Sequence, residues 1–415
     1  MKFSDLFNND YTPKWEYIET VPEFAVMKVC KHSAHWHKEG SPWDHTKLVV
    51  NNALALIRRG GCGNIMFKYH GNARHEKALL LAALFHDIAK PVVTDYDESK
   101  HDWAAPNHAN TGAFMTRMLL FDEDINLREE VVFIVRNHMM MHHILDNPKK
   151  IEKKLFKFAQ NEVINPWSDN PNDIVDYTAS FEMLCYMCMC DDFGSVCEDE
   201  AFVDKVYKQN RIYNLKEVIT ENGFSIKDGS FFAGVYGNQN CLIARHILFG
   251  EPLDDSKKDI KVCVLIGTPG SGKTTYYKKN FPDLPIVSRD IARADLGFCK
   301  PGEKYLGTKD EEDKVTKYLD NLCLKYAANG QDFVVDNTHV KEKYRGFLHS
   351  LLKGYRVEWD YIYIEAPTLE ENISRRQKDG FGEKAEGIIT NMFMGLEFPE
   401  TYEYDRLTVY KQTLD

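Results

Sequence analysis

A phosphate-binding loop is the strongest chemical signal in the sequence. The segment GTPGSGKTT matches the pattern GxxxxGK[ST] at Gly267, Gly272, Lys273 and Thr274. In this pattern, backbone N–H groups and the lysine bind the phosphates of a nucleotide, and the threonine hydroxyl binds Mg²⁺. We therefore expect ATP, or another nucleoside triphosphate, with Mg²⁺. The predicted nucleotide contacts are Gly267, Thr268, Pro269, Gly270, Ser271, Gly272, Lys273, Thr274 and Thr275.

A carboxylate between two arginines could complete a phosphoryl-transfer site. Asp290, in SRDIARADLG, follows an apolar run and could accept the proton of an attacking hydroxyl as a general base. Arg289 and Arg293 flank it as candidate substrate contacts. If the segment is helical, Arg293 shares a face with Asp290 and could clamp a phosphate of the acceptor. The alternative is a surface ion pair at the start of a helix.

Two later segments offer further candidates. Asp336, in VVDNTH, could orient the acceptor or the water on Mg²⁺, or it could cap the next helix. The stretch LEENISRRQKDG predicts a helix that carries Arg375, Arg376 and Lys378. A lid arginine that stabilises the transferring phosphoryl group would come from such a helix.

A second chemical centre lies earlier in the chain, in LAALFHDIAKP. Here His86 and Asp87 could bind one metal ion if neighbouring helices supply more ligands. Lys90 could reach a substrate phosphate, or it could stabilise the C-terminal end of a helix before Pro91. The further candidate ligands fall on other predicted helices or at their ends, and are His45, His108, His138 and Asp191.

The elements that must position these residues differ between the two halves. Residues 1–250 contain apolar stretches with helical periodicity, such as HTKLVVNNALALIRRG, which predict an all-α domain. After the polar segment GEPLDDSKKD, residues 250–259, four apolar runs alternate with helical stretches. That alternation predicts an α/β domain over residues 259–415 with a buried parallel sheet, whose ligands bind beyond the carboxyl ends of the strands.

Composition fits a soluble, multidomain protein. The chain has 415 residues, 43% of them hydrophobic, and a formal net charge of −11, which disfavours a general electrostatic grip on nucleic acid. We expect a cytoplasmic location, because no signal peptide and no membrane-spanning run is visible. The clustered cysteines in FEMLCYMCMCDDF have metal-site spacing, but the surrounding apolar residues favour a buried helix.

The C-terminal motifs resemble those of 5′-hydroxyl polynucleotide kinases of the bacteriophage and bacterial RNA-repair type, over residues from about 260 to 400. The resemblance implies that Asp290 is the general base, that Arg293 clamps an acceptor phosphate, and that Lys273 and Thr274 bind nucleotide and Mg²⁺. In the lid, this sequence departs from the family pattern, so the resemblance extends only to Arg375.

The order His, His-Asp, His, His, Asp in the N-terminal half resembles the HD phosphohydrolase superfamily. The resemblance implies that one divalent metal is bound by His45, His86, Asp87 and Asp191, with Asp87 also catalytic and Asp192 a rival for the last position. It implies that His108 and His138 hold a second metal or the substrate phosphate. The family order favours His138 over the nearby His142 and His143. Mn²⁺, Fe²⁺, Co²⁺, Ni²⁺ and Zn²⁺ all suit such ligands.

Together the two modules resemble the HD phosphohydrolase–polynucleotide kinase fusions of RNA repair. The resemblance implies phosphorylation of a 5′-hydroxyl end and removal of a 2′,3′-cyclic, 2′ or 3′ phosphate from RNA or DNA ends, before a separate ligase acts. Three alternatives remain open. They are a small-molecule nucleoside or nucleotide kinase joined to a nucleotidase, an HD domain that only binds a strand, and a toxin-type kinase that phosphorylates a sugar nucleotide.

Overall fold

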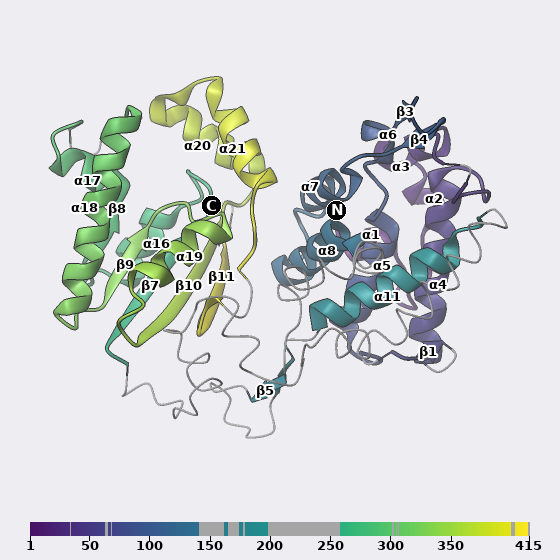
Figure 1. Ribbon diagram of the computed structural model, residues 1–415, viewed down its shortest axis with the longest axis horizontal. Helices are drawn as coiled ribbons and strands as arrows, with labels where there is room; N and C mark the ends of the chain where they lie inside the picture. Colours follow the sequence, from purple (N-terminus) through teal and green to yellow (C-terminus); the bar gives the residue numbers. More distant parts are fainter. Residues whose placement is uncertain are drawn as a thin grey trace. The chain divides into compact units, whose positions relative to one another are not determined.

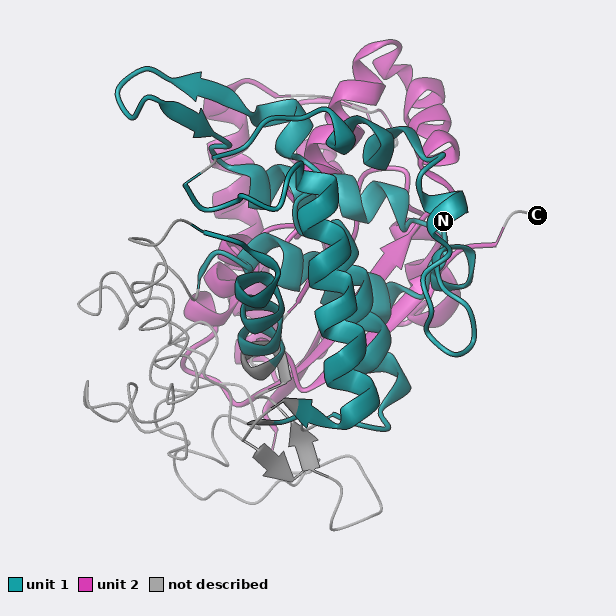
Figure 2. Ribbon diagram, turned by 90° about the vertical axis from the view of Figure 1, so that its right-hand side faces the viewer, with its two compact units in different colours: residues 1–163, 175–227 teal, residues 164–174, 228–415 magenta. Residues whose placement is uncertain are grey.

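Two compact units make up the protein. This computed structural model describes residues 1–33, 35–62, 65–67, 69–140, 162–164, 174–176, 179–197, 258–300, 303, 305, 307–399 and 403–413 (Figure 1). Residues 1–163 and 175–227 belong to unit 1, and residues 164–174 and 228–415 to unit 2 (Figure 2). Most of the predicted boundary segment, at residues 250–257, lies outside the described residues, so its position stays a prediction.

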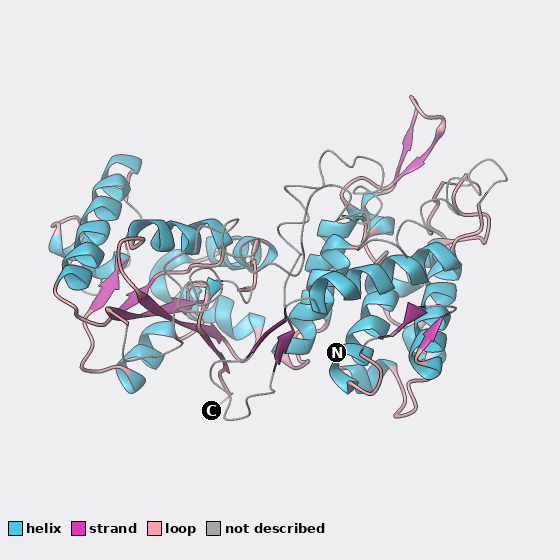
Figure 3. Ribbon diagram, turned by 60° about the horizontal axis from the view of Figure 1, so that its bottom comes forward, coloured by secondary structure: helices cyan, strands magenta, loops and turns pink. Residues whose placement is uncertain are grey.

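Helices make up most of the described part of unit 1, and strands occur there only in short pairs (Figure 3). The helices are α1 (Phe3–Leu6), α2 (Trp15–Ile18), α3 (Pro22–Ala25), the 3₁₀ turn η1 (Val26–Lys28), α4 (Pro42–Arg59), α5 (Ala73–Phe85), α6 (Lys90–Val93), α7 (His108–Leu119), α8 (Ile125–Asn137) and α11 (Ala179–Gly194). The paired strands are β1 (Gly61–Cys62) with β2 (Ile65–Met66) and β3 (Asp95–Asp97) with β4 (Asp102–Ala104). A further strand, β5 (Glu162–Ile164), pairs with β6 (Ile174–Asp176), and of these residues Ile164 and Ile174 are assigned to unit 2.

Local sequence sets the ends of the two central helices. Ser41 caps α4 and forms a capping box with Asp44, and the helix ends at Gly60 in the left-handed conformation at φ 66°. The side chain of Asn72 caps α5, which buries nearly every residue from Ala78 to Phe85. Because α5 is apolar on all sides, it forms the centre of a core built with α4, α8 and α11.

The sheet of unit 2 is parallel and five-stranded, with the order β11-β10-β7-β9-β8. Its strands are β7 (Ile260–Ile266), β8 (Ile286–Ser288), β9 (Phe333–Asp336), β10 (Val357–Glu365) and β11 (Arg406–Lys411). The helices are α16 (Lys273–Asn280), α17 (Arg289–Asp295), α18 (Lys309–Ala328), α19 (Glu342–Leu351), α20 (Leu369–Arg376), the π turn η4 (Gln377–Phe381) and α21 (Lys384–Met394). This architecture confirms the predicted α/β class.

The four apolar runs seen in the sequence became β7, β8, β9 and β10, but β11 was not predicted. Its residues are alternately exposed and half-buried, since among the described strands it forms an edge of the sheet and pairs with β10 alone. An edge strand of this kind has no buried apolar run to reveal it.

Two further expectations concern α11 and membranes. The cysteine-rich segment forms a helix whose Cys188 and Cys190 are buried, as predicted, and burial raises the pKa of the Cys188 thiol well above its usual value. Among the described residues, no helix combines the length and apolar character that a membrane crossing would need.

Candidate functional site

The predicted metal ligands of unit 1 come from five helices that meet at one place. His45 lies in the first turn of α4, and His108 is the first residue of α7. His86 and His138 are the residues that end α5 and α8. Asp87 follows His86 in a turn, and Asp191 lies in the last turn of α11. His142 and His143 lie outside the described residues.

The side chains of these residues form two adjoining groups that share Asp87. In the first, His45 Nε2 lies 2.8 Å from Asp191 Oδ1 and 4.0 Å from Asp87 Oδ2, and His86 Nε2 lies 3.4 Å from Asp87 Oδ2 and 3.8 Å from Asp191 Oδ1.

In the second group, His108 Nε2 lies 3.6 Å from Asp87 Oδ1 and 3.2 Å from His138 Nε2. The ligand atoms of His45, His86 and Asp87 lie within 4.8 Å of one another, and so do those of Asp87, His108 and His138. Each group offers ligand atoms that could hold a divalent metal, and Asp87 belongs to both groups.

Backbone carbonyl groups orient the imidazole rings of three of these histidines through their Nδ1 atoms. The Nδ1 atoms of His86, His108 and His138 lie 3.0, 2.8 and 2.7 Å from the carbonyl oxygens of Ala83, Ala105 and Val135, three residues earlier in each case. Each Nδ1–H can donate to its carbonyl, which leaves Nε2 with a lone pair for a metal.

Two buried polar atoms test whether a metal fits this site. His86 Nε2 and Asp87 Oδ2 are buried and make no hydrogen bond, although Lys90 Nζ lies 2.6 Å from Asp87 Oδ2 as an ion pair. A buried imidazole nitrogen without a partner is costly unless something else binds it. The donor set of imidazole nitrogens and carboxylate oxygens therefore fits a divalent transition metal.

Glu39 is a site residue that the sequence analysis missed. Its Oε1 lies 2.9 Å from His45 Nδ1 and 2.8 Å from His37 Nδ1, and its Oε2 accepts the Val196 backbone N–H at 2.8 Å. A carboxylate behind a ligating histidine fixes the ring and makes it a stronger ligand. The sequence signal was the spacing His37-x-Glu39 shortly before His45.

The carboxylates control protonation in this cluster. Burial opposes a charge on His45, but its contacts with Asp191 and Glu39 raise the pKa of the imidazole to about 9. Burial and the nearby imidazoles of His108 and His86 lower the pKa of His138 to about 3. Lys90 and His86 hold the pKa of Asp87 well below its usual value despite burial. Asp87 is thus an anion that can bind metal, and His138 is neutral.

A glycine and a buried ion cluster hold the ligand-bearing helices together. A Cβ on Gly194 would lie 2.7 Å from Val49 Cγ2 and 3.2 Å from Val49 N, so a glycine lets α11 approach α4 and brings Asp191 to His45. Between α7 and α8, the buried Glu129 contacts the guanidinium groups of Arg117 at 2.6 Å and Arg128 at 2.9 Å. This cluster ties the helix of His108 to the helix of His138.

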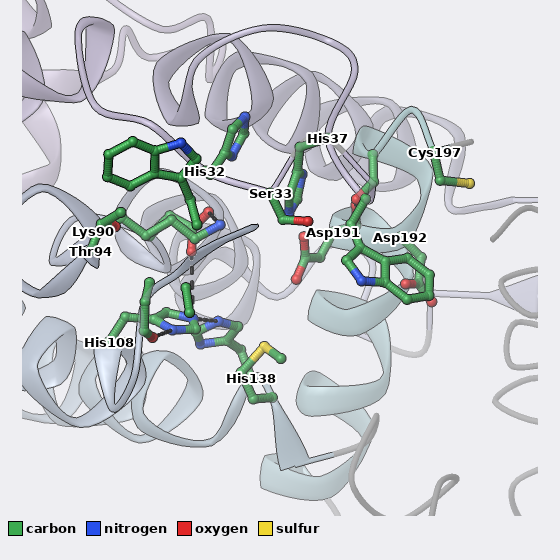
Figure 4. A pocket seen from close by; sticks show the side chains of 17 residues that line it. His32, Ser33, His37, Lys90, Thr94, His108, His138, Asp191, Asp192 and Cys197 are labelled. Atoms are coloured by element: carbon green, nitrogen blue, oxygen red, sulfur yellow. Dashed lines mark hydrogen bonds and ion pairs between the residues drawn. The ribbon is translucent and has the colours of Figure 1, made fainter. Parts of the chain in front are cut away.

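A cavity of about 390 Å³ opens over the metal ligands (Figure 4). Lys90, His108, His138 and Asp191 line it, and in Figure 4 these side chains converge on it from different elements. Lys90 is the first residue of the short helix α6, and its ammonium group contacts Asp87. Its ammonium group lies where a substrate phosphate at the metal cluster could meet it.

In unit 2, the predicted phosphate loop joins β7 to α16. Lys273 Nζ donates to the carbonyl oxygens of Gly267 and Thr268, both at 2.9 Å, so it lies folded against the loop. A Cβ at Gly267 would lie 2.3 Å from the Ile364 carbonyl oxygen, which explains why only glycine fits there. Gly272 ends the loop with φ 94°, and the exposed Thr274 and Thr275 follow it in the first turn of the helix.

The predicted Mg²⁺ residue and the strand-end carboxylate meet. Thr274 Oγ1 donates to Asp336 Oδ2 at 3.1 Å, across the adjacent strands β7 and β9. The next helix, α19, has Lys341 at its N-cap, so Asp336 does not cap it. A hydroxyl and a carboxylate at this position can share a magnesium ion or its water ligands.

Both arginines that flank Asp290 converge on a glutamate that the sequence analysis did not single out. Arg293 Nη1 donates to Asp290 Oδ1 at 2.8 Å, and its Nε donates to Glu312 Oε1 at 2.8 Å. Arg289 Nη2 donates to Glu312 Oε2 at 2.6 Å. Burial opposes the charge, but the two guanidinium groups lower the pKa of Glu312 to about 2. Glu312 therefore fixes both arginines beside Asp290, whose side chain stays half-exposed.

Helix α20, where the sequence predicts a lid, contacts the phosphate loop through the side chains of Asn372 and Arg375. Asn372 Oδ1 accepts the Thr268 hydroxyl at 2.5 Å, and its amide donates to the Pro269 carbonyl oxygen at 2.5 Å. Arg375 donates to the Gly270 carbonyl oxygen at 3.4 Å and to Gln412, a residue that directly follows β11. Residues from late in the chain therefore hold the phosphate loop in place.

Comparisons with known proteins match each unit separately. A family model described as an HD domain matches residues 43–161, and a second described as an AAA domain (AAA_33) matches residues 262–397. The first range contains His45, His86, Asp87, His108 and His138, and the second contains the phosphate loop. Asp191 lies beyond the matched residues.

Matches to whole proteins are weaker. No curated protein matches the chain. A solved structure described as "a putative kinase from chloroflexus aurantiacus j-10-fl" shares 14% identity with a TM-score of 0.30, over 38% of this chain and 90% of the other.

Proposed function

We propose that this protein, which joins a phosphohydrolase-type HD domain to a kinase-like P-loop domain, heals both ends of broken nucleic acid strands. Unit 2 would phosphorylate a 5′-hydroxyl end with ATP, and unit 1 would remove a phosphate from a 2′,3′-cyclic, 2′ or 3′ phosphate end. A separate ligase would then join the strands.

The kinase step rests on the groups around the phosphate loop. Lys273 would turn from the Gly267 and Thr268 carbonyls to the nucleotide phosphates. Asp290 would accept the proton of the 5′-hydroxyl as it attacks the terminal phosphorus. Arg293, held by Glu312, would bind the acceptor's first phosphate. A Mg²⁺ ion at Thr274 and Asp336 would neutralise charge on the phosphates.

The phosphohydrolase step rests on the cluster in unit 1. A divalent metal held by His45, His86, Asp87 and Asp191 would supply a nucleophile at neutral pH and neutralise charge on the phosphate. His108 and His138 could hold a second ion. Lys90 would bind a phosphoryl oxygen from the cavity side, since its ammonium group lies at the edge of the cluster.

One observation carries the proposal: a kinase-like loop and an Asp290–Arg293 pair at the carboxyl end of β8 occur in one chain with a buried His–Asp cluster. The pair supports an acceptor that carries its own phosphate, because Arg293 is fixed beside the proposed base. A strand end is an acceptor of this kind, whereas a free nucleoside has no phosphate for Arg293 to bind.

The test uses an oligoribonucleotide with a 5′-hydroxyl and a 2′,3′-cyclic phosphate, incubated with ATP and a panel of divalent metals. We expect a 5′-phosphate and loss of the terminal phosphate in the same tube. Equal activity on free nucleosides would instead favour a small-molecule kinase joined to a nucleotidase. A DNA oligonucleotide with a 3′-phosphate shows whether phosphate removal requires the ribose 2′-hydroxyl.

A further inference from the structure

Two exposed tryptophans line the cavity over the metal cluster. The structure describes five of the six tryptophans in the chain. Among these five, Trp36 and Trp103 are 39% and 38% exposed, whereas Trp43 and Trp359 are buried. Both exposed indoles line the cavity that Lys90 also lines. Large aromatic rings left partly in water beside a reactive cluster indicate a surface for a flat ligand.

The segments that carry the two indoles are held in place by contacts with each other. The Ser33 hydroxyl donates to Asp102 Oδ2, which links the stretch before Trp36 to the strand that contains Trp103. On the hairpin, Trp103 lies opposite Tyr96 in register, with the rings edge to face at 5.5 Å. The Trp36 segment is also anchored where Lys38 N donates to the Val196 carbonyl oxygen at 2.6 Å. These links pre-organise the cavity wall.

The charges around the cavity favour stacking over electrostatic binding. Among the described residues that line it, Lys90 is the sole lysine or arginine, while Asp87, Asp191 and Asp192 are acidic. His32 also lines it, but burial and the nearby His37 lower the pKa of its imidazole to about 4, so it is neutral at pH 7. A substrate held here must therefore gain affinity from something other than multiple phosphate contacts.

We propose that Trp36 and Trp103 form a stacking subsite for the nucleobase of the terminal nucleotide whose phosphate is hydrolysed in unit 1. This inference rests on the proposed phosphohydrolase function and specifies its substrate as a base-bearing end rather than a simple phosphate ester. Every base has a flat face that an indole can cover, so the subsite would accept all four bases.

The indole of Trp103 and the predicted ligand His108 come from neighbouring parts of the chain. The metal ligand His108 lies four residues after Ala104, the last residue of the strand that carries Trp103, and both Ala104 and Ala105 line the cavity between them. In a terminal nucleotide one sugar joins the base to the phosphate, so one nucleotide would fill both the cluster and the stacking subsite.

The experiment compares two ends on the full-length, metal-loaded protein. One oligoribonucleotide carries a 3′-methylenephosphonate, which cannot be hydrolysed, on a normal terminal nucleotide. The other carries the same group on an abasic terminal ribose. Binding is measured by calorimetry, and hydrolysis of the matching 3′-phosphate ends is measured in parallel. The variants are Trp36→Ala, Trp103→Ala, their Phe counterparts, and Tyr17→Ala, which removes an exposed ring on α2 outside the cavity.

We expect the wild-type protein to bind the base-bearing end about 5- to 150-fold more tightly than the abasic end, the range for one stacked base. The Ala variants should lose most of this preference, the Phe variants and Tyr17→Ala should keep it, and hydrolysis of the abasic end should be unchanged in all of them. Equal binding of both ends by an active wild-type protein, or full preference in both Ala variants, would refute the stacking subsite alone. Failure of the wild-type protein to act on either end would refute the proposed function as well.

Discussion

Glu39 lies directly behind His45, with 2.9 Å between Glu39 Oε1 and His45 Nδ1, while the opposite nitrogen of the ring faces Asp191 at 2.8 Å. A histidine held in this way has one nitrogen committed to the protein and the other directed at the metal position. Glu39 is therefore a positioning residue for the metal cluster.

Replacing Glu39 should weaken metal binding without unfolding the protein. We expect Glu39→Gln to lower metal affinity about 10- to 100-fold, the usual effect of losing a carboxylate behind a ligand histidine. Equilibrium metal titration of the full-length protein measures this, and the exposed Glu16→Gln serves as the control. Metal affinity equal to wild type would show that Glu39 does not orient His45.

The two activities should be separable by substitution. Lys273→Ala and Asp290→Ala should abolish 5′ phosphorylation and leave phosphatase activity intact, because their contacts lie within unit 2. His86→Ala and Asp87→Ala should do the reverse. Both reactions are followed on one oligonucleotide with labelled ends. Full phosphatase activity in His86→Ala and Asp87→Ala would overturn the assignment of these residues as metal ligands. Loss of both activities in a folded variant would contradict two independent sites.

Replacing Glu312 should raise KM for the acceptor strand more than KM for the nucleotide. Because Glu312 fixes Arg289 and Arg293, Glu312→Gln should raise KM for a 5′-hydroxyl oligonucleotide about 10-fold, as expected for the loss of one charged hydrogen bond, and leave KM for ATP within about two-fold. Steady-state kinetics with each substrate varied in turn distinguish the two. A rise confined to KM for ATP would show that Arg289 and Arg293 act on the nucleotide and not on the acceptor.

The close approach of α11 to α4 predicts the effect of a single methyl group. Gly194→Ala places a Cβ against Val49 and should destabilise the protein by about 1–3 kcal/mol, with weaker metal binding as Asp191 moves from His45. Gly112→Ala is the matched control, since its nearest neighbours would lie at 3.5 Å, an ordinary contact. Denaturant unfolding and metal titration measure both. Equal stability of Gly194→Ala and Gly112→Ala would show that α11 can move away from α4 without a loss of stability.

Acid sensitivity should depend on Glu129. Burial opposes its charge, but Arg117 and Arg128 lower its pKa to about 2, below the ordinary value of 4.5. A depressed carboxyl pKa stabilises the folded state above pH 4.5, and this stability is lost as the pH falls towards 2. At pH 7, Glu129→Gln should cost about 3–5 kcal/mol, because it leaves two buried guanidinium groups without their anion.

The comparison of unfolding curves at several pH values checks this. The gap in unfolding free energy between wild type and Glu129→Gln should be constant from pH 7 to 5 and should shrink below pH 4.5. A gap that does not change down to pH 3 would mean that Glu129 keeps its ordinary pKa in the folded protein.

Part of the chemistry could be predicted from sequence because it is local. The phosphate loop is contiguous, so its glycines, lysine and threonine determine the backbone shape and the ligand groups together. The Asp290–Arg293 pair was predictable for the same reason, since one turn of helix brings residues three apart to one face. The helical class of unit 1 and four of the strands of unit 2 followed from apolar periodicity.

The remaining features depend on which helices and loops pack together. His45 and Asp191 are 146 positions apart, and Arg375 meets Gln412 through the unpredicted strand β11. The contacts of Glu39 and Glu312, and the cavity lined by Trp36 and Trp103, form between separate segments of the chain. Local sequence determined the groups capable of phosphate chemistry. Only the tertiary structure decided their partners, because charge, burial and distance depend on packing between segments far apart in the chain.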